Sequence, residues 1–229
     1  MHKRMRSTQL TPSLIQLTRL RFVNAYLVRE EDGFTLVDAT FPGAAESLID
    51  AAEAAGAAIV RVAVTHGHLD HVGSVDALKA RLGGAAEILV PARDARILAG
   101  EEPKPKGSWG KVQTKPEVVL DAGDRVGSLE VIATPGHTPG HVAFLDTRDQ
   151  TIIAGDVFVS YGGLTVTNHF HLQFPFAATA TWDRQKDLES ARAISDLHPK
   201  LLAVGHGPAV SDPGAALEHA IARSARALS

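Results

Sequence analysis

The sequence predicts an α/β protein with two β-sheets and helices outside them. Apolar runs typical of buried strands alternate with stretches of helical spacing along the 229 residues. Two hairpin patterns, at residues 22–37 and 141–154, are also each followed by a helical stretch, which indicates a weak internal duplication. The length fits one domain, and we expect a single domain over residues 1–229.

The first half of the chain contains three predicted strands. Residues 22–28 and 35–37 flank a polar turn, and residues 59–65 form an apolar run bounded by glycines. Helical patterns are found at 44–55 and 72–82, and in the second of these the apolar residues fall on one stripe. The predicted order is therefore hairpin, helix, buried strand and helix.

The second half alternates in the same way after a surface loop. A stretch rich in Pro, Gly and Lys at 101–116 predicts that loop. The charged pairs of the helix at 182–197 predict a solvated helix face, and the irregular, aromatic segment at 159–181 predicts a functional loop. The remaining predicted elements are strands at 118–120, 129–133, 141–145, 151–154 and 201–204 and a helix at 213–228.

The composition excludes several classes of protein. The net charge is −3 and there is no long basic run, so nucleic acid is not an expected partner. Cysteine is absent, which removes disulfides, thiolate ligands and a cysteine nucleophile. No segment is long and apolar enough to cross a bilayer. We expect a cytoplasmic chain that acts on a small molecule and binds neither nucleic acid nor membrane.

One short stretch is dense in metal-ligand residues. His66, His68, Asp70 and His71 fall within six residues, His-Gly-His-Leu-Asp-His. Imidazole and carboxylate are the ligand types that zinc and similar divalent ions favour. The stretch lies between a predicted strand and a predicted helix, where open α/β sheets place their ligands.

Three further strand ends carry residues of the same type. His137 follows the strand 129–133, Asp156 follows 151–154, and His206 follows 201–204. One such residue at one strand end is unremarkable, but four strand ends of this kind indicate a common cause. A shared metal centre provides that cause.

These motifs resemble those of the metallo-β-lactamase superfamily of hydrolases. The resemblance rests on the His-rich stretch, on Thr-Pro-Gly-His at His137, on Ala-Gly-Asp at Asp156 and on Val-Gly-His-Gly at His206. It covers about residues 22–208. It implies a four-layer αββα sandwich, in which two mixed β-sheets are flanked by helices.

The resemblance also implies a dinuclear metal centre. His66, His68 and His137 would hold the first ion, Asp70, His71 and His206 the second, and Asp156 both. Seven ligands are too many for one tetrahedral ion but suit two ions that each keep an open position. Zinc is the expected metal, with iron or manganese as alternatives. The implied reaction is attack by a metal-bridging hydroxide on the carbonyl of a small ester, thioester or lactone, with Asp70 as the catalytic residue that orients the hydroxide.

Other polar residues are candidates for supporting roles. Ligating imidazoles usually donate their second N–H to a partner, and Asp38, Thr65 and Thr134 are candidates, with Asp38 preferred. His141 lies in a predicted strand, so we expect it to support a ligand or the core and not to bind metal. The candidates for substrate contact are Tyr161, Asn168, His169 and His171, although a solvated loop would also explain them.

Departures from known subgroups narrow the predicted reaction. Zinc β-lactamases of the best-known kinds use a cysteine ligand, which this chain lacks. Glyoxalase II shares the ligand set, but its glutathione-binding helical extension exceeds the 23 or so residues after His206. Lactonases of the superfamily usually carry Tyr three positions after the bridging Asp, where this chain has Val159.

A different class of reaction uses part of the same ligand set. Persulfide dioxygenases of the superfamily bind one iron through two histidines and a carboxylate, available here as His66, His137 and Asp156. The complete second set favours a dinuclear hydrolase over this oxidoreductase. A binding protein that has kept only the fold is a third alternative, and the intact set of seven ligands argues against it. The sequence patterns leave the substrate and the oligomeric state open.

Overall fold

The computed structural model describes residues 5–170 and 174–228, which fall into two compact units. The N-terminal unit comprises the described residues up to Pro103 together with Trp109–Leu120. The C-terminal unit comprises Lys104–Ser108 and the described residues from Asp121 onward. Each unit has its own mixed sheet and its own helices, and a single domain over the whole chain stays a prediction.

The N-terminal unit is built on a seven-stranded sheet whose strands follow the order of the sequence. Strands β1 to β4 pair antiparallel, whereas β4 to β7 pair parallel. Parallel neighbours need crossover connections, and helices supply them here. The strands are β1 (Arg6–Gln9), β2 (Leu14–Arg19), β3 (Val23–Arg29), β4 (Phe34–Val37), β5 (Ile59–Ala63), β6 (Glu87–Pro91) and β7 (Val118–Leu120).

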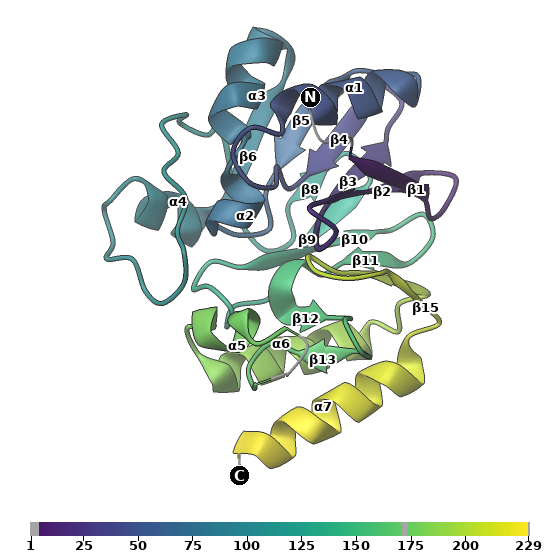
Figure 1. Ribbon diagram of the computed structural model, residues 1–229, viewed down its shortest axis with the longest axis vertical. Helices are drawn as coiled ribbons and strands as arrows, with labels where there is room; N and C mark the ends of the chain where they lie inside the picture. Colours follow the sequence, from purple (N-terminus) through teal and green to yellow (C-terminus); the bar gives the residue numbers. More distant parts are fainter. Residues whose placement is uncertain (1–4, 171–173, 229) are drawn as a thin grey trace. The chain divides into compact units, whose positions relative to one another are not determined.

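Helices of this unit lie beside its sheet (Figure 1), and they pack on it through leucine side chains. Leu48 of α1 and Leu78 of α3 are fully buried in one apolar cluster with Leu27, Leu36 and Val62 of the sheet. Burial of each such side chain stabilises the fold by about 1.5–3 kcal/mol. The helices are α1 (Ala45–Ala54), α2 (Leu69–Val72), α3 (Val75–Leu82) and α4 (Ala92–Leu98), with a 3-10 turn at Gly83–Ala85.

The C-terminal unit is built on a six-stranded sheet in the order β15-β14-β11-β10-β9-β8. Strands β11 and β14 are parallel, and the other pairs of this sheet are antiparallel. A separate antiparallel pair is formed by β12 and β13. The strands are β8 (Arg125–Val126), β9 (Leu129–Ala133), β10 (Val142–Asp146), β11 (Thr151–Ile153), β12 (Phe158–Val159), β13 (Thr165–Val166), β14 (Leu201–Ala203) and β15 (Val210–Ser211).

Three helices accompany this sheet. Helix α6 begins where the side chain of Asp183 accepts hydrogen bonds from the backbone N–H of Gln185, at 3.1 Å, and of Lys186, at 3.0 Å, which is the arrangement of an N-cap. Ile194 of α6 and Leu217 of α7 are buried in one apolar core with the sheet. The helices are α5 (Phe176–Ala180), α6 (Arg184–Asp196) and α7 (Gly214–Leu228), and a 3-10 turn spans Gly155–Val157.

The prediction of two mixed sheets flanked by helices is confirmed. The two predicted hairpins are β3 with β4 and β10 with β11, each antiparallel. The sequence patterns do not predict β1, β2, β6 or α4. In β2 the polar Gln16 interrupts the apolar pattern, yet it is buried because its side chain donates to Asn24 Oδ1 at 2.9 Å. In the segment 159–181, predicted as irregular, the structure forms β13 and α5, and β12 ends at its first residue, Val159.

No helix among residues 5–170 and 174–228 has the length and hydrophobicity needed to cross a membrane.

Asp76, in the first turn of α3, fixes the end of the loop that precedes β7. Its carboxylate accepts hydrogen bonds from Gln113 N at 3.0 Å, from Thr114 N at 2.8 Å and from Thr114 Oγ1 at 2.7 Å. Partial burial raises the pKa of Asp76, but these hydrogen bonds outweigh it and hold the pKa below its usual value of 3.8. The carboxylate therefore stabilises the fold above that value, and the stabilisation is lost as the pH falls through the lower, folded-state pKa.

We expect Asp76→Ala to lower the free energy of unfolding by about 1 kcal/mol near neutral pH. The difference from the unchanged protein should shrink below about pH 4. Urea unfolding at several pH values measures both effects. Glu53→Ala, at an exposed position of α1, is the matched control. A difference that stays constant down to pH 2.5 would contradict the assignment.

Candidate functional site

The loop between β5 and α2 gathers four of the predicted metal ligands. His66 and His68 lie in the loop, and Asp70 and His71 lie in α2 itself. The three imidazoles are buried, and the ring centroid of His66 lies 4.8 Å from that of His68 and 4.1 Å from that of His71. Asp70 Oδ2 lies 3.9 Å from His71 Nε2, and the Asp70 side chain is 23% exposed. The N-terminal unit thus concentrates three imidazoles and one partly exposed carboxylate at the end of β5.

This loop is held by two residues distant in sequence. The backbone N–H of Gly67 donates to Asp94 Oδ2 at 2.8 Å, and Asp94 is fully buried. Trp109 forms an isolated antiparallel bridge with His68, and their ring centroids are 5.4 Å apart. A Cβ atom at position 67 would lie 2.5 Å from the Trp109 ring, so only glycine fits between the two histidines. Trp109, predicted within a surface loop, is instead buried against the ligand loop.

Asp38 holds two of the imidazoles through one carboxylate. It follows β4 with a φ of 65°, in the left-handed region that Asp tolerates better than most residues. His71 Nδ1 lies 2.8 Å from Asp38 Oδ2, and Thr65 Oγ1 donates to the same oxygen at 2.9 Å. Because the Thr65 hydroxyl gives its proton to Asp38, it accepts at 3.0 Å from His66 Nδ1. Both imidazoles then carry their proton on Nδ1 and the lone pair on Nε2, which is the form that binds metal.

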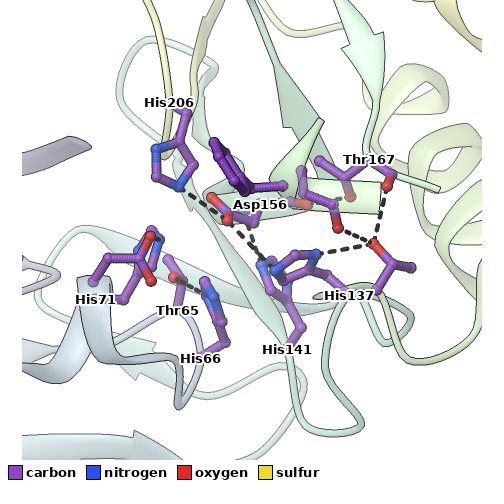
Figure 2. A network of polar contacts seen from close by, with 12 residues as sticks. Thr65, His66, His71, His137, His141, Asp156, Thr167 and His206 are labelled. Carbon is purple, nitrogen blue, oxygen red and sulfur yellow. Dashed lines mark hydrogen bonds and ion pairs between the residues drawn. The ribbon is translucent and has the colours of Figure 1, made fainter. Parts of the chain in front are cut away.

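The C-terminal unit brings the other three predicted ligands together. Strands β11 and β14 are parallel neighbours, so the residues after their carboxyl ends, Asp156 and His206, lie side by side. His206 Nε2 lies 3.2 Å and His137 Nε2 3.4 Å from the same oxygen, Asp156 Oδ2. Figure 2 shows His206 and His137 reaching this carboxylate. All three side chains are buried.

His137 is held by a threonine hydroxyl. Its Nδ1 lies 3.2 Å from Thr181 Oγ1, and that hydroxyl lies 3.0 Å from the carbonyl oxygen of Thr167. The hydroxyl therefore donates to the carbonyl and accepts from Nδ1, which again leaves the lone pair on Nε2. Thr167 in turn donates from Oγ1 to the carbonyl oxygen of Asp156 at 2.6 Å. These contacts tie His137 to Thr181 and Asp156 to Thr167, and Figure 2 shows Thr167 near Asp156 and His137.

A second buried carboxyl group of this unit, that of Asp187, is connected to Asp156 through Thr167. Its Oδ2 lies 3.0 Å from Thr167 Oγ1. Burial raises the pKa of Asp187 well above its usual range, and the negative charge of Asp156 raises it further. The contact with the Thr167 hydroxyl opposes this shift without cancelling it. The prediction that the helix at 182–197 presents its charges to solvent is wrong for Asp187, which is fully buried.

Both ring nitrogens of His141 are engaged by protein groups. The backbone N–H of Asp156 donates to His141 Nε2 at 3.0 Å, so Nε2 carries the lone pair and Nδ1 the proton. His141 Nδ1 lies 2.8 Å from Thr134 Oγ1. This geometry favours the predicted role of a residue that supports a ligand.

Replacing His141 with Ala is expected to leave the metal content per chain unchanged. It removes the acceptor of a buried N–H, so the free energy of unfolding should fall by about 1–3 kcal/mol. Elemental analysis and urea unfolding test the two expectations. Loss of one ion per chain would identify His141 as a ligand.

A cluster of aromatic side chains lies beside His206 in the C-terminal unit. Phe174 lies with its ring centroid 4.6 Å from that of His206, and Tyr161 stacks on Phe174 at 5.9 Å. Phe176 meets Phe174 edge-on, with centroids 6.2 Å apart, and is 73% exposed. Tyr161, predicted to contact substrate, is therefore part of an aromatic cluster beside a predicted ligand. Substrate contact itself stays a prediction.

The other substrate-contact candidates lie in different surroundings. Asn168 is buried, where its Oδ1 accepts from Ser224 Oγ at 2.8 Å and its Nδ2 donates to the Arg184 carbonyl at 3.0 Å. These contacts with α7 and α6 indicate a structural role for Asn168. His169 Nδ1 lies 3.2 Å from Asn168 Oδ1. His171 lies outside the described residues.

Sequence reasoning did not find Asp94, Thr167, Thr181 or Asp187. A buried Asp in a helix has the same local pattern as a solvated one, and threonine is common in loops. The only available signal was the position of Thr167 and Thr181 in a long aromatic segment.

The donor set suits divalent metal ions in each unit. The N-terminal unit offers three imidazoles and Asp70, and the C-terminal unit offers two imidazoles and Asp156. Nitrogen and carboxylate oxygen are ligands of zinc, iron and manganese. His66, His71 and His137 also have the Nδ1 contacts that ligating imidazoles normally make. The residues present therefore fit bound metal.

Residues 18–206 match the family model of the metallo-beta-lactamase superfamily. All seven predicted ligands lie within this matched range. The chain belongs to this superfamily. It is 42% identical over 211 residues to a Bacillus subtilis (strain 168) protein, Uncharacterized protein YobT, a match that covers 88% of this chain and 90% of that protein. It is 36% identical over 125 residues to a hydroxyacylglutathione hydrolase of Rhodospirillum rubrum, covering 53% of this chain and 42% of that enzyme.

A solved structure shows the same fold. A metallo-beta-lactamase with the HARLDQ motif from Cronobacter sakazakii is similar with a TM-score of 0.72 and 20% identity. The match covers 99% of this chain and 93% of that chain.

Proposed function

We propose that this protein is a metal-dependent hydrolase that cleaves a small ester, thioester or lactone with two divalent ions. The observation that carries the proposal is the state of the buried imidazoles. His66, His71 and His137 each have Nδ1 bound to an oxygen acceptor, so each presents the Nε2 lone pair that a metal ion needs. A histidine that only fills space in the core does not need its lone pair on Nε2, so three buried histidines of this form favour metal binding.

We assign the seven ligands to two ions. In this assignment His66, His68 and His137 hold the first ion, Asp70, His71 and His206 hold the second, and Asp156 contacts both. The family match over 18–206 supports it, because it spans every one of these residues. When bound there, two such ions would lower the pKa of water from about 15.7 toward about 7 and would polarise a substrate carbonyl.

Asp70 and the aromatic cluster supply the protein's own contribution to the reaction. Asp70 is 23% exposed, whereas the side chains of Asp156 and Asp38 are 5% and 2% exposed. Water can therefore reach Asp70, and its carboxylate can accept a hydrogen bond from that water and orient it. Phe174 places apolar surface against His206 and excludes bulk solvent there, and Tyr161 stacks on Phe174.

The substrate class rests on chemistry and on similarity. Oxygen and sulfur leaving groups suit a site with two cations, because the second cation can stabilise the departing anion. Similarity to a hydroxyacylglutathione hydrolase favours an acyl substrate. That match covers 42% of the enzyme, so we do not extend the glutathione moiety to this chain.

Metal content per chain and a substrate panel test the proposal together. The protein is purified without added metal, analysed for metals, and assayed with small esters, thioesters and lactones. Two ions per chain and hydrolysis of at least one class are expected. One iron per chain with oxygen consumption on thiol persulfides would favour the dioxygenase reaction instead. No hydrolysis by a protein that carries two ions would refute the substrate class.

A further inference from the structure

Asp187 lies in the first turn of α6, yet its side chain is fully buried. Among the described residues, no lysine, arginine or histidine side chain is paired with its carboxyl group. Burying such a group costs several kcal/mol unless hydrogen bonds compensate it. Apolar residues of similar size would fill the space without this cost. The position therefore calls for a role that a carboxyl group performs and an apolar side chain does not.

The side-chain hydrogen bond of Asp187 leads, through one threonine, to the ligand residue Asp156. Its Oδ2 lies 3.0 Å from Thr167 Oγ1, and that hydroxyl lies 2.6 Å from the carbonyl oxygen of Asp156. The Asp187 carboxyl group is thus linked to the backbone of Asp156 through a threonine.

The turn that carries His137 is packed against the same point of α6. Gly136 has a φ of 147°, and a Cβ atom there would overlap the backbone of Asp187. The N–H of Asp183 donates to the Gly136 carbonyl at 2.9 Å, and the N–H of Trp182 donates to the His137 carbonyl at 3.0 Å. The start of α6 is therefore fixed to the turn that carries His137, and the side chain of Asp187 is buried at this contact.

We propose that Asp187 is a positioning residue, which sets the separation of His137 and Asp156 through its contact with Thr167 and its packing against the turn at Gly136. The arrangement parallels that of Asp38 in the N-terminal unit, where one buried carboxylate and one threonine, Thr65, serve His66 and His71. The inference rests on the proposed function only in taking His137 and Asp156 as metal ligands. It assigns to Asp187 control over how tightly those two residues hold metal.

Metal affinity of the purified, metal-depleted chain tests this role without any substrate. Competition with a chromophoric chelator gives the dissociation constant for Zn²⁺, and the absorption spectrum with Co²⁺ reports the ligand geometry. Asp187→Leu should weaken Zn²⁺ binding by about 10–100-fold and alter the Co²⁺ spectrum. Asp187→Asn, which keeps hydrogen-bonding groups at the same place, should restore most of the affinity. Thr167→Val should weaken binding as well, and it provides a second test if Asp187→Leu fails to fold.

Asp183→Ala is the matched control, because it removes the N-cap of the same helix without touching a ligand residue. It should lower the stability measured by urea unfolding and leave the Zn²⁺ dissociation constant unchanged. Equal losses of affinity in Asp183→Ala and Asp187→Leu would show a general effect of helix stability and overturn the proposal. Wild-type affinity in both Asp187→Leu and Thr167→Val would also overturn it. If the unchanged protein binds no Zn²⁺, the proposed function fails together with this inference, whereas the two preceding outcomes refute the inference alone.

Discussion

Replacing Asp38 with Ala is expected to lower the affinity for divalent metal by about 10–100-fold, and hydrolysis with it. Asp38 accepts from His71 Nδ1 and from the Thr65 hydroxyl that in turn holds His66. Without the carboxylate both imidazoles lose the contact that fixes their orientation and their protonated nitrogen. In the proposed assignment one substitution disturbs ligands of two different ions, which is why the effect should exceed that of any single supporting residue.

Asp38→Asn separates the effect of the lost charge from the effect of backbone strain. At a φ of 65°, Ala adds backbone strain of about 1–2 kcal/mol, whereas Asn tolerates this conformation. Asp38→Asn should therefore fold nearly as well as the unchanged protein but bind Zn²⁺ more weakly. Asp146→Ala is the control for loss of a buried carboxylate, because Asp146 pairs with Arg148 at the far end of β10. Unchanged Zn²⁺ affinity in both Asp38 variants would remove Asp38 from the metal site.

The sequence predicted those site residues whose position follows from local order along the chain. His66, His68, Asp70 and His71 are adjacent in sequence, and the end of a strand places them. Asp38 could be proposed because it directly follows a predicted strand. In each case the pattern of residues within about ten positions is enough to predict that the residue belongs to the site.

Asp187 could not be predicted, because its role depends on the contact between two distant segments. Whether a helix position faces solvent or a neighbouring turn depends on packing. Here Gly136 approaches the backbone of Asp187 so closely that a Cβ atom would not fit between them. The start of α3 is a similar case. The predicted helix at 72–82 begins at Val75, and a Cβ atom at Gly73, the residue between α2 and α3, would overlap Pro42, which is distant in sequence. Hydrophobic periodicity does not record such contacts.

Asp70→Ala is expected to lower kcat/KM for hydrolysis by about 10²–10⁴-fold while the fold stays intact. The side chain is partly exposed and lies in the first turn of the four-residue helix α2, where loss of an acidic group costs about 0.3–1 kcal/mol. Its loss should remove both a ligand of the second ion and the acceptor that orients water. Metal analysis should accordingly show that the second ion is lost in preference to the first.

Asp76→Ala is a demanding control for this experiment. Asp76 occupies the first turn of α3, holds a loop through three hydrogen bonds, and should cost at least as much stability as Asp70 when replaced. If catalysis depended on the general stability of this region, Asp76→Ala would lower kcat/KM as much as Asp70→Ala. We expect instead that Asp76→Ala keeps full activity and that Asp70→Ala loses it. Full activity in Asp70→Ala would exclude Asp70 from the reaction.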